Sequence, residues 1–432
     1  MGKIYTNQNV YDASQSRLEY IFNEFENVLV AFSGGKDSGV CLNMVYEYAK
    51  EHGMLDKVAM YHLDYEAQYQ MTTDYVTKVF SEYPGIKKYW LCLPIAAQCC
   101  CNMTSGTWIP WEREKQNIWV REMPDSEYVI NQDNVQFQFK EGDMDYKVQT
   151  NFSKWFSKEY GKTAVVVGIR ASESLHRYVA VSKDDKKIIY DGKKWCSVID
   201  KNTVNAYPIY DWETSDIWTA NAKFEWDYNK LYDLYYQAGL TIDKMRVASP
   251  FNDCASETLK LYKVIDPNMW GKMVSRVNGV NFTGIYGGTT AMGWKSITLP
   301  KGHTWKSYCE FLLNTLDEDT RNHYIRIFNT SFKYWMEKGG NIDKDLYDEM
   351  LQKNNVKIKD VCQAKRYPNK NKVTFEEYPD DIDVGRFAEV PTYKRMCICI
   401  LKNDYFCKYM GFGQTKSDLE KRKKAIEKYK NI

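Results

Sequence analysis

The chain has 432 residues, of which 15% are aromatic, and a formal net charge of +2 at pH 7. This length exceeds what one hydrophobic core usually serves, so we expect two or three domains. The near-neutral charge provides no global field for nucleic acid or a membrane surface, and no apolar run is long enough to cross a bilayer. The first residues lack an apolar signal core, which predicts a cytoplasmic protein whose twelve cysteines are reduced thiols.

Residues 27–53 predict a buried strand, a glycine-rich turn and a helix. Residues 28–32 are an apolar run of strand length, and residues 38–50 carry apolar side chains at helical spacing. The two glycines of the turn let a ligand approach the backbone, and the helix start points free N–H groups at the same place. An ordinary turn with a Ser or Asp helix cap is the alternative. The full string favours a phosphate-binding loop, and its members are Ser33, Gly34, Gly35, Lys36, Asp37 and Ser38.

A second predicted strand, residues 57–63, is followed by Asp64. Ligands of open α/β sheets bind outside the carboxyl ends of parallel strands, so Asp64 should face the same edge as the loop. We therefore expect it at the ligand, where its carboxylate can hold Mg²⁺. A polar strand end or a helix cap is the alternative.

After a third predicted strand at residues 89–93, the chain becomes dense in tryptophan and arginine. Arg113 and Arg121 are candidates to reach a phosphate or sulfate group. The tryptophans of this stretch favour packing, with an adenine wall as the other interpretation.

Residues 163–168 predict another buried strand, which ends in glycine and runs into Ile-Arg-Ala-Ser-Glu-Ser-Leu-His-Arg. The two arginines, seven residues apart, flank a carboxylate that can hold one of them in place. A surface helix with salt bridges is the alternative. The candidate binding residues here are Gly168, Arg170, Glu173 and Arg177. Arg246 and Arg276 further along are candidates to extend the basic lining, with a surface ion pair as the alternative for either.

Two local structures are predicted beyond this motif. Residues 179–198 alternate like strands around turns at 183–187 and 191–192, which predicts a β-hairpin excursion. Thr214 or Ser215 should then cap a helix.

The last third of the chain differs in composition. Residues 278–302 hold six glycines and predict a linker between domains at 1–290 and 303–432. We expect amphipathic helices over 305–316 and 324–336. Basic clusters at residues 357–372 and 416–430 indicate solvated faces or, alternatively, a nucleic-acid contact.

Cysteine spacing carries little signal for metal chemistry. The twelve cysteines lack the paired spacing of zinc or iron–sulfur sites. Cys397 and Cys399, one residue apart, predict a strand with both thiols on one face.

The loop resembles the signature of the PP-loop ATP pyrophosphatase superfamily. Its lysine follows Gly35 directly, whereas the P-loop of kinases needs four residues between its first glycine and Gly-Lys-Ser/Thr. Residues 168–177 resemble the G-I-R-x-x-E-S-x-x-R element of the phosphoadenosine phosphosulfate (PAPS) reductase branch, and residues 208–218 resemble its P-l-x-d-W-t-x-x-D-V-w segment. The remainder is similar to the C-terminal domain of unknown function in IbrA-type proteins, co-regulators that pair with a ParB-like protein, IbrB.

The resemblance implies an α/β domain with a parallel sheet and a mostly helical C-terminal domain. It also implies that the residues above bind ATP or PAPS together with Mg²⁺. Residues from Asn229 on resemble the region where this branch places a metal-site or reductive cysteine. The expected thiols are missing there, because Met245-Arg246-Val247 stands near their position and only Cys254 follows.

Three functions stay open. The favoured one is adenylation of a substrate with pyrophosphate release, in which Lys36, Arg170 and Arg177 are catalytic. The second is sulfonucleotide reduction by a thiol not yet identified. The third is a nucleotide-gated co-regulator that acts with a ParB-like partner, or with nucleic acid through its basic C-terminal segments.

Overall fold

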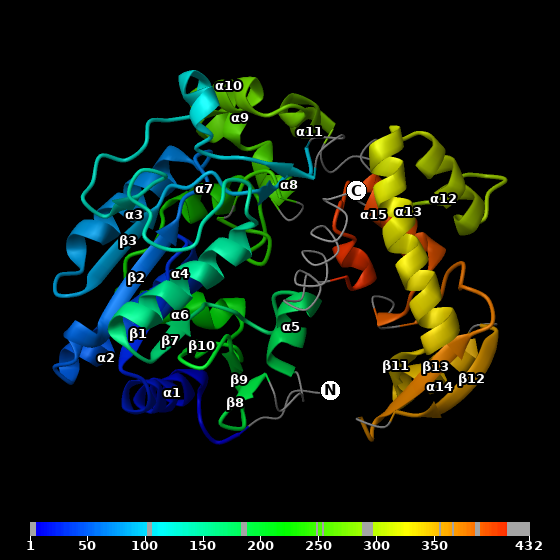
Figure 1. The fold of residues 1–432 in the computed structure, drawn as a ribbon, viewed down its shortest axis with the longest axis horizontal. Coiled ribbons are helices and arrows are strands. Elements are labelled where there is room, and N and C mark those ends of the chain that lie inside the picture. Colours follow the sequence, from blue (N-terminus) through cyan, green and yellow to red (C-terminus); the bar gives the residue numbers. More distant parts are fainter. Residues whose placement is uncertain are drawn as a thin grey trace, which may run out of the picture. The chain divides into compact units, whose positions relative to one another are not determined.

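The computed structural model describes residues 6–101, 106–182, 188–247, 249–252, 255–286, 297–353, 356–364, 367–384 and 389–412. It divides into two compact units, and Figure 1 labels the elements of each. The first comprises Met1–Cys99 and Thr107–Ile285, and the second comprises Cys100–Gly106 and Tyr286–Ile432. The predicted turn at 183–187, the thiol of Cys254, part of the predicted linker (287–296) and the basic cluster at 416–430 lie outside the described residues.

The first unit is an α/β fold around an eight-stranded sheet. The sheet contains β1 (Asn27–Ala31), β2 (Val58–Leu63), β3 (Lys87–Leu91), β6 (Val129–Ile130), β7 (Thr163–Val166), β8 (Ile189–Tyr190), β9 (Lys193–Val198) and β10 (Thr203–Ala206). Strands β4 (Ala97–Gln98) and β5 (Thr107–Trp108) form a separate antiparallel pair. The helices of the first unit are α1 (Val10–Glu24), α2 (Lys36–Glu51), η1 (Leu55–Lys57), α3 (Gln70–Glu82), η2 (Arg113–Ile118), α4 (Asp145–Tyr160), α5 (Leu175–Ser182), α6 (Thr214–Lys223), α7 (Leu231–Gln237), α8 (Ser256–Leu259), α9 (Tyr262–Ile265), α10 (Pro267–Arg276) and α11 (Val280–Tyr286).

The strand order of the sheet is β6-β3-β2-β1-β7-β10-β9-β8. Pairing is parallel from β6 to β10 and antiparallel from β10 through β9 to β8. The chain moves outward from β1 to β2, β3 and β6, and then returns to place β7 on the other side of β1. The order therefore reverses between β1 and β7, and such a switch point is where open α/β sheets bind ligands. The predicted α/β class with a parallel sheet is confirmed.

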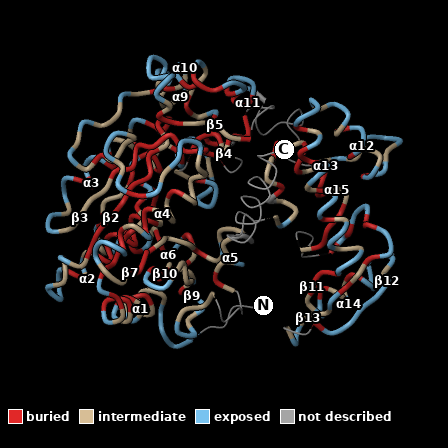
Figure 2. Tube along the Cα trace, viewed as in Figure 1, coloured by how far each residue is buried: buried red, intermediate tan, exposed pale blue. Residues whose placement is uncertain are grey.

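Helices cover both faces of the sheet, which explains why its central strands are apolar throughout. Val28 and Val30 of β1 face a core shared with α1, α2, α3 and α6, whereas Leu29 faces a core built on α4. Successive strand residues point to opposite faces, so a strand covered on both sides reads as a continuous apolar run. Figure 2 shows these strands as the buried centre of the first unit.

Two local predictions in the first unit need correction. Residues 179–182 belong to helix α5 and not to a strand; Val181 is buried there, and a short apolar run does not distinguish a strand from a helix. The hairpin itself is present as β8 and β9 around Asp191. The N-cap of α6 is Glu213, which forms a capping box with Asp216. The Glu213 side chain accepts the backbone N–H of Asp216, and the Asp216 carboxylate accepts the backbone N–H of Glu213.

The second unit is mainly helical, as predicted, and also contains a three-stranded antiparallel sheet of order β11-β13-β12. The helix predicted over 324–336 starts earlier, because Asp317 caps it by accepting the Thr320 N–H. Its elements are α12 (Trp305–Asn314), α13 (Glu318–Lys333), η5 (Tyr334–Lys338), β11 (Gly340–Asp343), α14 (Lys344–Lys353), β12 (Ile358–Gln363), β13 (Lys370–Phe375), α15 (Tyr393–Leu401) and η7 (Lys408–Met410).

The strand predicted at Cys397 and Cys399 is wrong, since both residues lie in helix α15. Thr392 starts this helix by accepting the N–H of Arg395. Both thiols are fully buried in a core shared with α12 and α13. A short apolar run does not distinguish a buried strand from a buried helix, and here the helix is the one that packs.

None of the helices in the described ranges combines the length and the apolar composition needed to span a membrane.

Candidate phosphate-binding site

The loop between β1 and α2 is closed by its own serines. Ser33 N–H donates to Ser38 Oγ at 3.1 Å, and the Ser38 hydroxyl donates to Gly35 O at 3.0 Å. Gly34 has a φ of +76°, and a Cβ there would lie 3.0 Å from Val76 of α3. The turn is therefore tight, and it leads directly into α2, whose first residue is Lys36.

The carboxylate of Asp37 forms ion pairs with two cations, Lys36 and Arg170. Lys36 Nζ lies 3.0 Å from Asp37 Oδ2, and Arg170 Nε lies 2.5 Å from Asp37 Oδ1. Burial acts to raise the pKa of the Asp37 carboxyl, but the charges of Lys36 and Arg170 outweigh it and hold the pKa below its ordinary value. Asp37 is therefore ionised at neutral pH. Since Arg170 also donates to Thr214 Oγ1 at 3.1 Å, its guanidinium is fixed in place.

Gly168 lets the second motif lie against the loop. A Cβ at this position would be 2.9 Å from the carbonyl carbon of Asp37 and 3.0 Å from Ser38 N. No side chain fits at that separation, so the chain after β7 passes directly over the start of α2. The switch point of the sheet thus brings the two sequence motifs together.

Glu173 holds two further arginines. Arg177 Nε lies 3.0 Å from Glu173 Oε2, and Arg246 Nη1 lies 3.1 Å from Glu173 Oε1. Arg177 also donates to Gly168 O at 3.5 Å. The structure therefore brings together the binding residues predicted from the two motifs, and it places Arg246 at Glu173 of the second motif.

Asp64 lies directly after β2, but both of its carboxylate oxygens already accept hydrogen bonds from protein groups. Arg121 Nη2 lies 2.5 Å from Oδ2 and 2.6 Å from Oδ1, Trp90 Nε1 donates to Oδ2 at 2.7 Å, and the Glu66 N–H donates to Oδ1 at 2.8 Å. Burial acts to raise the pKa of Asp64, yet the nearby Arg121 charge holds it below its ordinary value. A Mg²⁺ ion would have to displace a buried guanidinium, so Asp64 in this arrangement does not fit as a magnesium ligand.

The part of the chain that the structure describes offers no other candidate metal site. Within those ranges, no group of three or more His, Cys, Asp or Glu side chains is arranged to hold a metal ion.

The remaining arginines proposed from sequence have structural partners. Arg113 is exposed and pairs with Asp133 at 2.6 Å. Arg276 is buried against Glu66, with Nε at 3.0 Å from Oε1 and Nη2 at 3.2 Å from Oε2. Neither guanidinium lies among the groups gathered around Asp37 and Glu173.

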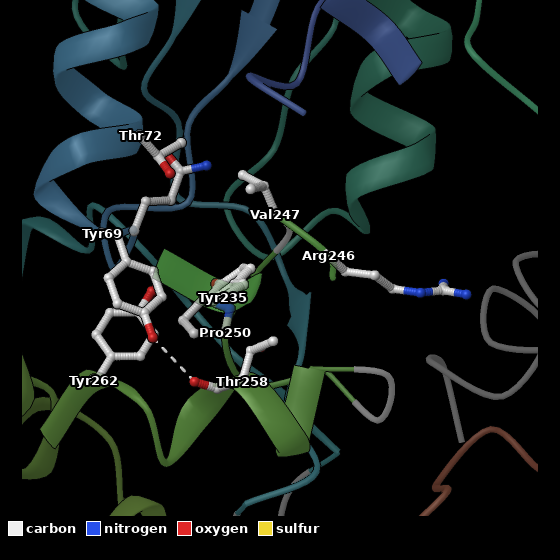
Figure 3. Close-up of a pocket in the computed structure, with 9 residues that line it drawn as sticks. Tyr69, Thr72, Tyr235, Arg246, Val247, Pro250, Thr258 and Tyr262 are labelled. Carbon is white, nitrogen blue, oxygen red and sulfur yellow. Dashed lines mark hydrogen bonds between the residues drawn. The ribbon is translucent and has the colours of Figure 1, made fainter. Parts of the chain in front are cut away.

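A small cavity lies between the start of α3 and residues of α7, α8 and α9. Its volume is about 10 Å³, room for about one water molecule. Figure 3 shows the stacked rings of Tyr69 and Tyr262 on one wall, with the Tyr69 hydroxyl donating to Thr258 O at 3.0 Å. Arg246 contributes to the lining but points away from the other side chains. Its guanidinium instead reaches Glu173, as described above.

Sequence reasoning missed two residues that touch the loop. The amide of Asn229 donates to Gly34 O at 3.3 Å, and the hydroxyl of Tyr232 accepts the N–H of Lys36 at 3.0 Å. Both belong to a stretch far along the chain, and no local spacing connects them to the loop. Their only signal was the resemblance of residues after 229 to the part of the PAPS reductase branch that carries its reductive cysteine.

A parallel sheet with a glycine-rich loop and clustered arginines at its switch point defines an α/β protein with a candidate site for an anionic ligand. Residues 27–238 match the family model "Phosphoadenosine phosphosulfate reductase domain", and residues 239–421 match a "Domain of unknown function (DUF3440)". YbdN of Escherichia coli strain K12, described as an uncharacterized protein, is 31% identical over 414 residues, which are 95% of this chain and 92% of YbdN. The chain belongs to the family of YbdN, and in this chain the PAPS reductase domain precedes DUF3440.

Solved structures with some likeness include PAPS reductase from Candida auris, at 17% identity and a TM-score of 0.29, covering 54% of this chain and 94% of that one. The NH3-dependent NAD synthetase of Campylobacter jejuni is 10% identical with a TM-score of 0.28, covering 64% and 96%. Scores this low carry no weight for the function of this chain.

Proposed function

We propose that the chain binds an adenosine nucleotide, ATP or PAPS, with its phosphates on the loop Ser33 to Ser38. With ATP as that nucleotide, it adenylates an acceptor and releases pyrophosphate. The observation that carries the proposal is the gathering of Lys36 and Arg170 on Asp37 at the start of α2. A helix N-terminus with two buried cations favours a polyanion. Residues 27–238 match the PAPS reductase domain model, which supports an adenosine nucleotide as that polyanion.

The proposed chemistry is attack of the acceptor on the α-phosphorus. A bond forms from the acceptor atom to the α-phosphorus, the bond from that phosphorus to the α–β bridging oxygen breaks, and the electron pair leaves on pyrophosphate. The backbone donors at the start of α2 and the ammonium of Lys36 stabilise the charge that develops on the leaving group. Arg170 and Arg177 steady the α-phosphoryl centre, and their carboxylate partners Asp37 and Glu173 keep them oriented. Because Asp64 does not fit as a magnesium ligand, none of these steps is assigned to a metal.

The bond is tested with α-labelled ATP, purified protein and fractionated small molecules of a cell extract as acceptor source. The expected products are AMP or an adenylated compound together with pyrophosphate. ADP and phosphate, formed by wild-type protein and lost in Lys36→Ala, would mean that the wrong bond has been assigned.

Sulfonucleotide reduction is the second candidate, favoured by the family of the first unit. It requires an accessible thiol. The described cysteines of that unit are Cys41, Cys92, Cys99 and Cys196, and all are buried. Burial raises the pKa of the Cys41 thiol, which makes it a poor nucleophile. Sulfite release from PAPS with thioredoxin would favour the reductase over adenylation.

For the second unit we propose that it binds a protein or nucleic-acid partner. Basic residues on β12 and β13, among them Lys359 and Lys372, suit an acidic protein surface or nucleic acid. A ParB-like protein is the partner implied by the resemblance to IbrA-type proteins, and co-purification with such a protein tests it.

A further inference from the structure

The stretch from Asn229 to Val247, which we name the cover segment, contacts the loop at several points. Asn229 donates to Gly34 O, Tyr232 accepts from Lys36 N–H, and Met245 O lies 3.5 Å from Lys36 Nζ. Arg246 of the same segment pairs with Glu173 of the second motif. One segment thus spans both halves of the proposed nucleotide site.

The contact of Tyr232 occupies a donor that the proposed function requires. Lys36 is the first residue of α2, so its N–H has no acceptor within the helix and is available to a phosphate oxygen. In this structure the phenol oxygen of Tyr232 accepts that N–H at 3.0 Å. The same oxygen would lie 3.3 Å from a Cβ on Gly35, which places it over the glycine as well. The hydroxyl therefore stands at the surface where a phosphate group would rest.

The ring of Tyr232 and the carbonyl of Met245 lie against the lysine side chain. The ammonium of Lys36 lies 5.6 Å from the centre of the Tyr232 ring, and the lysine side chain is only 5% exposed. The Tyr232 ring is itself held against Trp218, with ring centres 5.3 Å apart. A phosphate that binds both the N–H and the ammonium of Lys36 must first move these groups.

We propose that Tyr232 is an internal occupant of the phosphate site and that a nucleotide binds by displacing its hydroxyl from the Lys36 N–H, which releases the cover segment from the loop. This rests on the proposed nucleotide binding, because a phosphate ligand is needed to compete. The exchange favours the ligand, since hydrogen bonds to a charged oxygen are about twice as strong as those to a neutral one. Nucleotide affinity is therefore set in part by the contact that the protein makes with itself.

The test compares Tyr232→Phe with Tyr235→Phe by calorimetric titration with ATP and with inorganic pyrophosphate. Tyr232→Phe keeps the ring but removes the competing oxygen, so both probes should bind about two- to tenfold more tightly, the range of one net hydrogen bond. Tyr235 is the matched control, because it is one turn along α7 and its hydroxyl interacts with Tyr69 and Thr258. Its variant should keep the wild-type affinity. Urea unfolding of both variants checks that the fold is retained.

Hydrogen exchange of the wild-type protein gives an answer that does not depend on any variant. Pyrophosphate should slow exchange of the amides in residues 33–38 and speed exchange in the cover segment. Slower exchange in both, or unchanged or weaker binding by Tyr232→Phe, would overturn the displacement while leaving nucleotide binding intact. If neither wild-type nor variant protein binds either probe, the nucleotide site fails and this inference fails with it.

Discussion

Arg170 Nε lies 2.5 Å from Asp37 Oδ1, so the carboxylate of the first sequence motif holds the guanidinium of the second. Asp37 and Arg170 are 133 positions apart in the sequence, yet they share this one ion pair. Because Asp37 also holds Lys36, three charged groups depend on one another for their positions. The predictions below follow from this arrangement and from the buried groups around it.

Replacement of Lys36 by Ala should weaken ATP binding by about 1.5–3 kcal/mol, the scale of a hydrogen bond to a charged group. Isothermal titration of the folded variant measures this. Lys50→Ala is the control, since Lys50 is exposed in the last turn of the same helix. Equal affinity of the Lys36→Ala and Lys50→Ala proteins would refute a role for the loop in ATP binding.

Gly168→Ala should disturb the start of α2, because its new methyl carbon would lie 2.9 Å from the Asp37 backbone. Overpacking of this kind costs about 1–3 kcal/mol of unfolding free energy. The same shift moves the loop, so ATP affinity should fall too. Gly271→Ala on α10 meets no atom within 4 Å and should leave both quantities near their wild-type values. Urea unfolding and titration check the pair of variants, and a fully stable Gly168→Ala protein contradicts the close approach.

Asp64→Asn should lower the free energy of unfolding by about 3–5 kcal/mol, because it leaves the buried Arg121 without its carboxylate. The Arg121 charge holds the pKa of Asp64 below the usual range of an aspartate in the folded state, so the ionised group stabilises the fold at pH values above that range. This contribution is lost as the pH falls through the folded pKa. Urea unfolding between pH 6 and about pH 3 should therefore show a smaller loss of stability for Asp64→Asn than for wild type. Parallel pH curves for the two proteins would speak against the ionised pair.

Arg177→Ala should slow turnover far more than it weakens binding. Removing one group that stabilises transition-state charge costs on the order of 10²-fold in rate. Initial rates of pyrophosphate release and titration with ATP separate the two effects. Arg113→Ala removes an exposed arginine paired with Asp133 and serves as the control. An equal loss of affinity and rate would instead assign Arg177 to ground-state binding.

Removal of residues 303–432 should leave ATP affinity within about a factor of three, because the loop and the cover segment belong to the first compact unit. The truncated protein should lose its contact with the proposed partner of the second unit. Titration and co-purification measure the two. If the shortened protein folds but no longer binds ATP, the second unit contributes to the nucleotide site.

The loop and the second motif were readable from sequence because both are local. Each consists of a buried strand, a glycine and a run of polar residues within about ten positions, so spacing alone indicates what the backbone must do. The class of fold followed from the same alternation of buried strands and helices. Even the edges of these elements shift by only one or two residues, as at β2, which starts at Val58.

The contacts that complete the site were not readable, because they join positions distant in the chain. Tyr232 reaches Lys36 across 196 positions, and Arg276 reaches Glu66 across 210. Nothing in the residues beside Tyr232 indicates that its hydroxyl accepts a backbone N–H from α2. Arg121 looked like a phosphate ligand, but its partner is the carboxylate of Asp64. Pairing of this kind is decided by tertiary packing.

The position of β7 also has a consequence for how the chain is made. Strand β1 pairs with β2 early in the sequence, but its other edge is completed only when Thr163–Val166 arrive. During synthesis, one edge of the apolar strand β1 therefore stays unpaired until the ribosome has translated the chain from β2 to β7. Nascent chains that stall before β7 carry this unfinished edge, and an open apolar edge favours aggregation.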